Sequence, residues 1–209
     1  MKNQTRFLQR VYVALTNTLN TPELLAALAE FNYDAKKVRQ GLSLYQRVEE
    51  LTQQREQAQE AQYQATQLLT DAKERLLSLF KIHVDTARLS YRREASSYQD
   101  TLGLTRTTPR DTASCLKHIK RFYAHVPPVM MAKYHVPQKE LHEGIRLADR
   151  VQELLALKTK ATSQPQHLSA LRQQALEELQ TWMRRFDKIT QLALEDQPQQ
   201  REALGRTVR

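Results

Sequence analysis

Apolar residues recur at every third or fourth position along two long stretches of the chain, within residues 35–95 and 138–198. This spacing puts them on one face of a helix and is typical of the contact face of a coiled coil. We call the two sets the seam. In the first stretch the seam contains Leu44, Val48, Leu51, Ala58, Ala65, Leu69, Ala72, Leu76 and Leu79. In the second it contains Leu147, Val151, Leu154, Ala161, Leu168, Ala175, Leu179, Trp182, Phe186 and Ile189.

Capping signals divide the chain before the first stretch. A first helix is expected over residues 5–18. Residues 21–23 read Thr-Pro-Glu, a helix start with a hydroxyl cap, proline in the first turn and an acid near the positive end. Asp34 is expected to cap the next helix, which contains only one glycine or proline, Gly41, before Gly103.

The two long stretches also resemble each other residue by residue. Asn32–Leu51 and His135–Leu154 align without a gap at a constant difference of 103 in residue number. The shared residues include Gly41 and Gly144, and the same alignment continues through both seams. A fixed register with matched apolar positions predicts an internal duplication.

The duplication predicts where the chain divides. The first helical repeat covers residues 1–104, a Thr/Ser-rich linker covers 105–114, and the second repeat covers 115–209. Asp111 and Ser114 are candidate caps for the helix that follows. We expect the two repeats to share one packed domain.

The middle of each long stretch leaves two architectures open. Residues 52–67 are polar, rich in Gln and good helix formers, with no turn residue. Pro165 lies in the matching zone of the second repeat and is expected to kink or break a helix there. One architecture has continuous helices of about 60 residues, ~90 Å if straight. The other folds each stretch into a hairpin near residues 57–66 and 160–167. The absence of turn residues favours the continuous helix in the first repeat.

Composition narrows the class of protein. Among 209 residues there are only four Gly and one Cys. Few glycines argue against barrels and sandwiches, and one cysteine excludes an internal disulfide. The first residues do not predict a signal peptide, because Arg10 interrupts their apolar stretch. No run of 18 apolar residues occurs, so we expect no membrane span and a cytoplasmic protein.

Basic residues exceed acidic ones, 32 to 23, which gives a net charge of +9 that lies mainly in the second half. A basic excess attracts polyanions. Tyr123, Tyr134 and Trp182 are interleaved aromatics that would stack on bases, although their alignment favours the core for Tyr123 and Trp182. The candidate polyanion-binding residues are Arg106, Arg110, Lys117, Lys120, Arg121, Arg184, Arg185 and Lys188.

Motifs for chemistry are missing from the sequence. No Glu-x-x-His or His-x-x-x-His pair occurs, and the glycines are too scattered for a phosphate-binding loop. Cys115, His118 and His125 form a possible set of metal ligands on one helix face, but the two histidines, at i and i+7, are too far apart to share a metal without other ligands. Cys115 at a helix start would have a lowered pKa, yet no oxyanion hole accompanies it. We therefore predict no catalytic residue, no metal and no cofactor.

The whole pattern resembles a family of uncharacterised bacterial proteins with an internally duplicated all-helical unit. The resemblance is carried by Arg10-Val11-Tyr12 in the opening helix, by PELLAAL, by the Gly41 helix with Arg47-Val48-Glu49, by the Gln-rich middle and by Leu102-Gly103. It implies a helical fold over nearly the whole chain and no activity.

These observations predict an all-α fold, an elongated helical bundle of two tandem pseudo-symmetric repeats with long coiled-coil-like helices. We expect a non-enzymatic structural or protein-interaction module that binds a protein partner or a second copy of itself. The alternative is a basic helical protein that binds nucleic acid or another polyanion. A ligand- or metal-binding helical bundle is the third reading.

Overall fold

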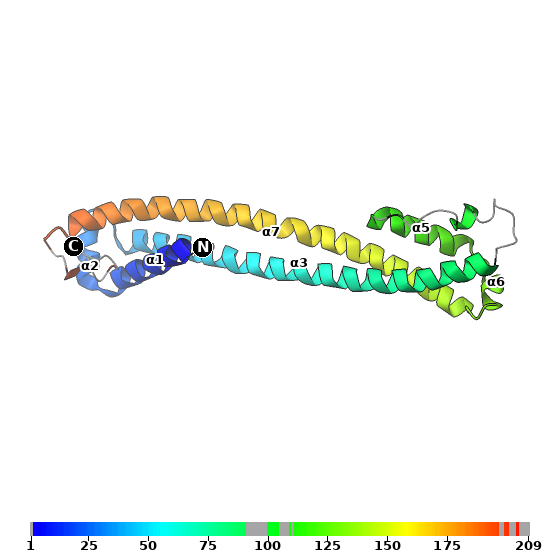
Figure 1. Cartoon of the computed structure of the whole chain (residues 1–209). Helices are drawn as coiled ribbons and strands as arrows, with labels where there is room; N and C mark the ends of the chain where they lie inside the picture. The colour runs from blue at the N-terminus through cyan, green and yellow to red at the C-terminus, as the bar shows by residue number, and fades with distance from the viewer. Residues whose placement is uncertain are drawn as a thin grey trace. The chain divides into compact units, whose positions relative to one another are not determined.

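The computed structural model describes residues 2–90, 100–104, 109, 111–196, 199–200 and 204. Those residues contain α-helices and no strand, which confirms the all-α prediction. The helices are α1 (Lys2–Asn20), α2 (Pro22–Ala29), α3 (Ala35–Ser90), α5 (Thr112–His125), α6 (Pro128–Ala132) and α7 (Gln138–Ala193) (Figure 1). Half of the expected linker, residues 105–108 and 110, lies outside the described residues.

The expected caps begin their helices as the sequence indicates. Asp34 Oδ1 accepts a 2.8 Å hydrogen bond from the backbone N–H of Lys37, and Asp111 Oδ1 accepts one of the same length from Ser114. Thr21 precedes Pro22 at the start of α2, but its hydroxyl makes no capping hydrogen bond. Local sequence therefore fixes where α2, α3 and α5 begin.

Both long helices are continuous. α3 and α7 each contain 56 residues, so the hairpins near 57–66 and 160–167 are wrong. α7 passes through Pro165 without a break, although proline removes one helical hydrogen bond and costs about 3 kcal/mol. Leu154 and Leu168, on either side of this proline, are buried, and their packing holds both flanking segments in the helix.

The chain forms two compact units, the first made from two segments and the second from one continuous segment. Unit 1 contains Met1–Ala58 and Gln164–Arg209, and unit 2 contains Gln59–Ser163. The units do not coincide with the predicted division at residues 105–114. Each unit takes one segment from each predicted repeat, because α3 and α7 run antiparallel and each contributes one half to either unit.

Unit 1 buries the apolar faces of α1 and α2 against the first half of α3 and the second half of α7 (Figure 1). Arg47 on α3 contacts Glu178 on α7, and Thr52 further along α3 contacts Arg172 earlier on α7. Residue numbers that rise on one helix as they fall on the other show that the helices are antiparallel. The fully buried side chains of this core include Leu15, Leu24, Leu28, Leu176, Leu179 and Phe186.

Unit 2 has its own core, formed by α5, α6, the second half of α3 and the first half of α7. Its fully buried side chains include Leu76, Leu102, Ile119, Phe122 and Met131. Phe80 packs edge-to-face on Phe122 and Tyr123, with ring centroids 5.3 and 6.1 Å apart. Aromatic pairs of this kind add about 0.5–1.5 kcal/mol each to the burial of their area.

α3 and α7 begin 103 residues apart, at Ala35 and Gln138. Asn32 and His135, also 103 apart, both have left-handed backbone conformations, with φ of 61° and 62°. Burial repeats at the same spacing along the two helices. The positions buried in both are Val38 and Leu141, Gly41 and Gly144, Val48 and Val151, Leu51 and Leu154, Ala65 and Leu168, Leu76 and Leu179, Phe80 and Met183, His83 and Phe186, and Ala87 and Thr190.

Within the part of the chain that the structure describes, no helix has an apolar window of the length and hydropathy needed to cross a bilayer.

Candidate functional site

The predicted polyanion-binding residues are divided between the two units. Arg106 and Arg110 lie outside the described residues. The other six form two groups of three, on α5 in unit 2 and on α7 in unit 1. They are Lys117, Lys120 and Arg121 in the first group, and Arg184, Arg185 and Lys188 in the second.

Two of the three α5 cations are engaged in bonds within unit 2. Lys120 Nζ lies 2.7 Å from Asp149 Oδ1 on α7, and Lys120 also donates to Gln152. Arg121 donates from Nε to the Thr101 carbonyl at 3.1 Å and from a terminal nitrogen to the Asp100 carbonyl at 3.2 Å. These bonds tether α5 to its neighbours, so binding a phosphate would have to displace them.

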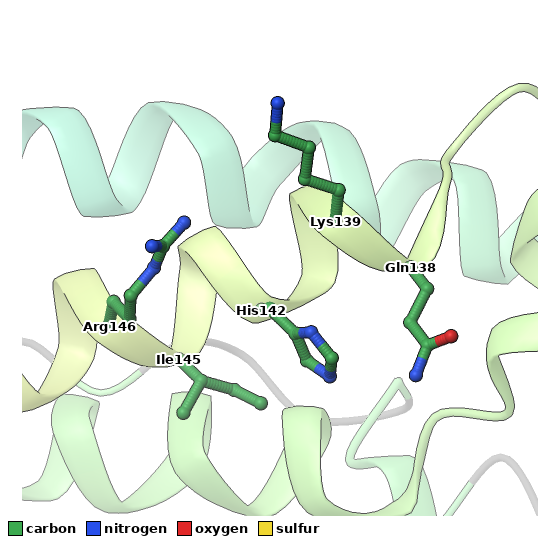
Figure 2. Close-up of a pocket in the computed structure, with 5 residues that line it drawn as sticks. All are labelled: Gln138, Lys139, His142, Ile145 and Arg146. Atoms are coloured by element: carbon green, nitrogen blue, oxygen red, sulfur yellow. The ribbon is translucent and has the colours of Figure 1, made fainter.

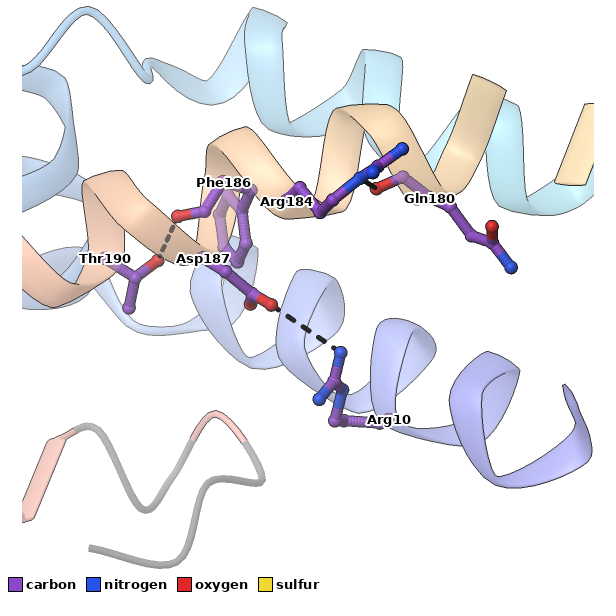
Figure 3. A network of polar contacts seen from close by, with 6 residues as sticks. All are labelled: Arg10, Gln180, Arg184, Phe186, Asp187 and Thr190. Atoms are coloured by element: carbon purple, nitrogen blue, oxygen red, sulfur yellow. Dashed lines mark hydrogen bonds and ion pairs between the residues drawn. The ribbon is translucent and has the colours of Figure 1, made fainter. Parts of the chain in front are cut away.

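The cations near the end of α7 are arranged differently (Figure 3). Arg184 donates to the Gln180 carbonyl and to the Thr181 hydroxyl, both on its own helix. Asp187, which the sequence places between Arg185 and Lys188, lies 3.6 Å from Arg10 on α1 (Figure 3). The acid therefore joins two helices of unit 1.

Cys115 and His118 on α5 both pack inside unit 2. Cys115 is buried, and burial raises the pKa of its thiol, which is opposite to the lowering expected from a helix start. Desolvation is the largest cause of the shift and outweighs the opposing effect of the Lys73 ammonium. His118 packs edge-on against Phe80 instead of facing a metal. No group of three potential metal ligands comes together among the described residues.

A buried polar group in unit 2 was missed by the sequence reasoning. His83 is fully buried, and its Nδ1 lies 3.0 Å from the hydroxyl of Tyr123. Its Nε2 lies 3.7 Å from a carboxylate oxygen of Glu140 and has no hydrogen-bond partner. Burial lowers the pKa of His83, while Glu140 acts in the opposite direction. Burial also raises the pKa of Tyr123, so both groups are neutral near pH 7.

The signal for this group was present but ambiguous. His83 occupies a position in α3 that matches Phe186 in α7, where an apolar residue is expected. From its position alone, His83 is indistinguishable from the apolar residues of the seam. Only the structure shows that Tyr123 on α5 faces it. Glu140 is only half exposed in side chain and sits on the first turn of α7.

Figure 2 shows a shallow pocket of about 700 Å³ at the start of α7. Gln138, His142 and Ile145 point to one side of the helix, whereas Lys139 and Arg146 point to the other (Figure 2). Arg146 is also paired with Glu143 at 2.6 Å. The two cations therefore do not converge on His142, and this pocket offers no concentrated charge.

Two further pockets lie in unit 1. One, of about 630 Å³, has the half-buried Trp182 ring on its wall, between Lys37 on α3 and Arg185 on α7. The indole N–H of Trp182 is buried and has no hydrogen-bond partner. The other, of about 460 Å³, lies between α1, α3 and α7, and two arginines, Arg55 and Arg172, line it. Of these three pockets, this last one is lined by two arginines and two tyrosines, Tyr12 and Tyr45.

Comparison with known proteins found no matching family model, no matching curated protein and no matching solved structure. The resemblance to a bacterial family of duplicated helical proteins therefore stays a prediction.

Proposed function

We propose that the protein is a non-enzymatic interaction module made of two copies of one helical unit, and that the copies present equivalent apolar surfaces to a protein partner. The proposal assigns no reaction to the chain. The duplication is supported by the 103-residue spacing of the first residues of α3 and α7 and by the buried positions that recur at that spacing.

The observation that carries the function is a set of exposed apolar residues that recur at the same spacing. Leu89 and Leu192 are 63% and 57% exposed. Phe31 and Tyr134 are 38% and 46% exposed. Single exposed apolar residues are common on any surface. Their recurrence at matched positions is what distinguishes these two pairs.

Each unit carries one aromatic residue and one leucine from this set. In unit 1, Phe31 precedes the start of α3 and Leu192 lies in the last turn of α7, which are the same end of an antiparallel pair. In unit 2, Tyr134 precedes α7 and Leu89 lies in the last turn of α3. Aromatic residues are enriched at the centres of protein interfaces, so both ends suit protein contact.

A photo-crosslinking residue, benzoylphenylalanine, tests this proposal when placed at Leu89 or at Leu192. We expect both positions to label the same partner, or a second copy of the chain. Lys81 and Arg184 provide a matched control, because they are exposed and also lie 103 residues apart. Equal labelling from the control positions, or labelling from neither leucine, would contradict the proposal.

Nucleic-acid binding is the competing function, and the net charge of +9 favours it. Lys120 and Arg121 weigh against it because both are engaged within unit 2. Titration against mixed RNA and DNA at about 150 mM salt distinguishes the two functions, since phosphate contacts weaken steeply with salt. Sub-micromolar affinity that Lys120→Glu with Arg121→Glu abolishes would make polyanion binding the function.

A further inference from the structure

The pocket between α1, α3 and α7 of unit 1 contains two guanidinium groups without an acidic partner. The Nε of Arg55 is buried and has no hydrogen-bond partner. Arg172 donates from Nε to the Thr52 hydroxyl at 2.8 Å, and that hydroxyl donates to the Val48 carbonyl at 2.7 Å. Neither arginine forms an ion pair with a described carboxylate. A partly buried guanidinium that lacks an anion is costly, so this end of the pocket favours a negative group.

The opposite wall of the same pocket is aromatic. The rings of Tyr12 on α1 and Tyr45 on α3 lie 5.5 Å apart between centroids. Burial raises the pKa of Tyr45, with smaller contributions from Glu49 and Tyr12, so its phenol is neutral. Leu8 lines the pocket beside these rings. The wall therefore suits a flat apolar group.

Three of the matched positions of unit 2 are filled by apolar side chains. Leu69 stands where unit 1 has Arg172, and Leu155 where it has Thr52, at the spacing of 103. Ala148 stands at the position of Tyr45. All three belong to the core of unit 2 or pack against it. The position of Arg55 is basic in both units, since Lys158 matches it. The α3–α7 pairing therefore folds without an arginine at the position of Arg172.

The α1 side of the pocket differs from its counterpart in the same way. If Arg10-Val11-Tyr12 is aligned with Arg121-Phe122-Tyr123, Gln4 and Thr5 correspond to Cys115 and Leu116. Both of the latter are buried in unit 2. Polar residues thus replace apolar ones on all three helices that surround the pocket, which indicates a ligand.

We propose that this pocket binds a small aromatic oxyanion, a carboxylate or a phosphate monoester attached to an aromatic ring. The oxyanion would accept hydrogen bonds from Arg55 and Arg172, and the ring would pack on Tyr12 and Tyr45. Glu49 and Glu56 also line the pocket and repel further negative charge, so the site favours one anionic group over a polyanion. This inference is independent of the proposed interaction surfaces.

Isothermal titration of the full chain with four small probes tests the site. Benzoate and phenyl phosphate carry both features, inorganic phosphate lacks the ring, and benzyl alcohol lacks the charge. We expect benzoate or phenyl phosphate to bind at least ten-fold more tightly than inorganic phosphate and benzyl alcohol. Absence of binding by both aromatic anions up to about 10 mM would overturn the proposal.

Arg172→Leu places the residue of unit 2 in the pocket and is expected to reduce affinity for the aromatic anion at least ten-fold. Arg55→Gln, which keeps a polar side chain, is expected to reduce this affinity by a similar factor. It replaces Arg172→Leu as the test if that variant fails to fold. Arg47→Leu is the matched control, since Arg47 lies on α3 in the same unit and pairs with Glu178. Unchanged affinity in a folded Arg172→Leu or Arg55→Gln variant, or an equal loss in Arg47→Leu, would overturn the assignment.

Discussion

The two units share a pattern of helices and differ in what fills them. Gly41 in unit 1 and Gly144 in unit 2 occupy matched positions, yet an added Cβ would come within 3 Å of the Trp182 ring in the first and of the Tyr123 ring in the second. Trp182 reaches Gly41 from α7, whereas Tyr123 reaches Gly144 from α5. The same small residue thus admits an aromatic ring from a different helix in each unit.

This exchange accounts for the different positions of the aligned tyrosines. Tyr123 is buried over Gly144 and bonds to His83. Tyr12, its counterpart in unit 1, is 49% exposed and lies beside Tyr45, because Trp182 already covers Gly41. Trp182 stacks on Phe186, which occupies the position of His83. The presence of Trp182 in unit 1, where unit 2 has Leu79, therefore goes with different contacts for Tyr12 and Phe186 than for Tyr123 and His83.

The matched seam leucines Leu76 and Leu179 provide the largest expected effect. They are 1% and 0% exposed, in unit 2 and unit 1. Leu76→Ala and Leu179→Ala should each lower the free energy of unfolding by about 2–5 kcal/mol, because each leaves a cavity in a packed core. Urea denaturation measures the loss, and the exposed Leu89→Ala is the control. A loss below about 0.5 kcal/mol at both buried sites would show that the seam is not the core.

Substitutions at Pro165 in α7 and at Gln62, the matched position in α3, compare the stability of the middle of the two helices. Pro165→Ala should raise the free energy of unfolding by up to about 3 kcal/mol, since it restores a helical N–H and removes a steric clash. Gln62→Pro should lower it by a similar amount. A loss of stability in Pro165→Ala would mean that the ring of this buried proline contributes more by packing than it costs the helix.

Gly144→Ala and Gly41→Ala compare the two aromatic contacts directly. Overpacking costs about 1–3 kcal/mol, and alanine returns about 1 kcal/mol of helix propensity. We expect Gly144→Ala to destabilise by about 1–2 kcal/mol and Gly41→Ala by less. Tyr123 is buried and held by His83, whereas the half-buried Trp182 has room to move. Thermal and urea denaturation of both variants measure the two losses of stability. If both substitutions stabilised the protein, neither glycine would be required for packing.

His83 gives the smallest effect, which appears only on acidification. Burial lowers its pKa in the folded state below the ordinary value of about 6.5. The unfolded chain therefore binds a proton first as the pH falls, and stability declines below about pH 6.5. His83→Phe, which introduces the residue found in unit 1, should reduce this decline.

The measurement for His83 is the urea midpoint at about pH 7.5 and about pH 5.5. The exposed histidine variant His142→Phe should keep the decline of the unaltered chain. A decline of equal size in His83→Phe would assign the pH dependence to other groups.

Much of the architecture could be predicted from the sequence, because its signals are local. Asp34 and Asp111 cap helices through residues three positions away, and the seam leucines Leu51, Leu76, Leu154 and Leu179 are buried as their spacing indicates. The continuity of α3 through its polar middle also follows from the absence of turn residues. These features depend on residues nearby in the same helix, and they do not depend on which other helix packs against that helix.

The polar interior could not be predicted, because it depends on contacts between helices far apart in sequence. His83 and Tyr123 are 40 residues apart, and Arg172 and Thr52 are 120 apart. The thiol of Cys115 shows the same limitation. Its place in the sequence indicates a helix start, but its pKa is governed by burial against other helices. The matched register suggests which positions face each other, and only the packed structure shows which side chain fills the space.

A duplicated helical unit requires α3 and α7 to pair in the same register in unit 1 and in unit 2. Disulfide formation tests this in a Cys115→Ser chain, with cysteines at Thr52 and Arg172 in unit 1 or at the matched Leu155 and Leu69 in unit 2. Gln40 with Arg172, displaced along the helix pair, is the control. We predict that both matched pairs oxidise to an internal disulfide, detected by mass spectrometry of the monomer, and that the control stays reduced. Oxidation of the unit 1 pair while the unit 2 pair stays reduced would contradict a shared register and with it the duplicated unit.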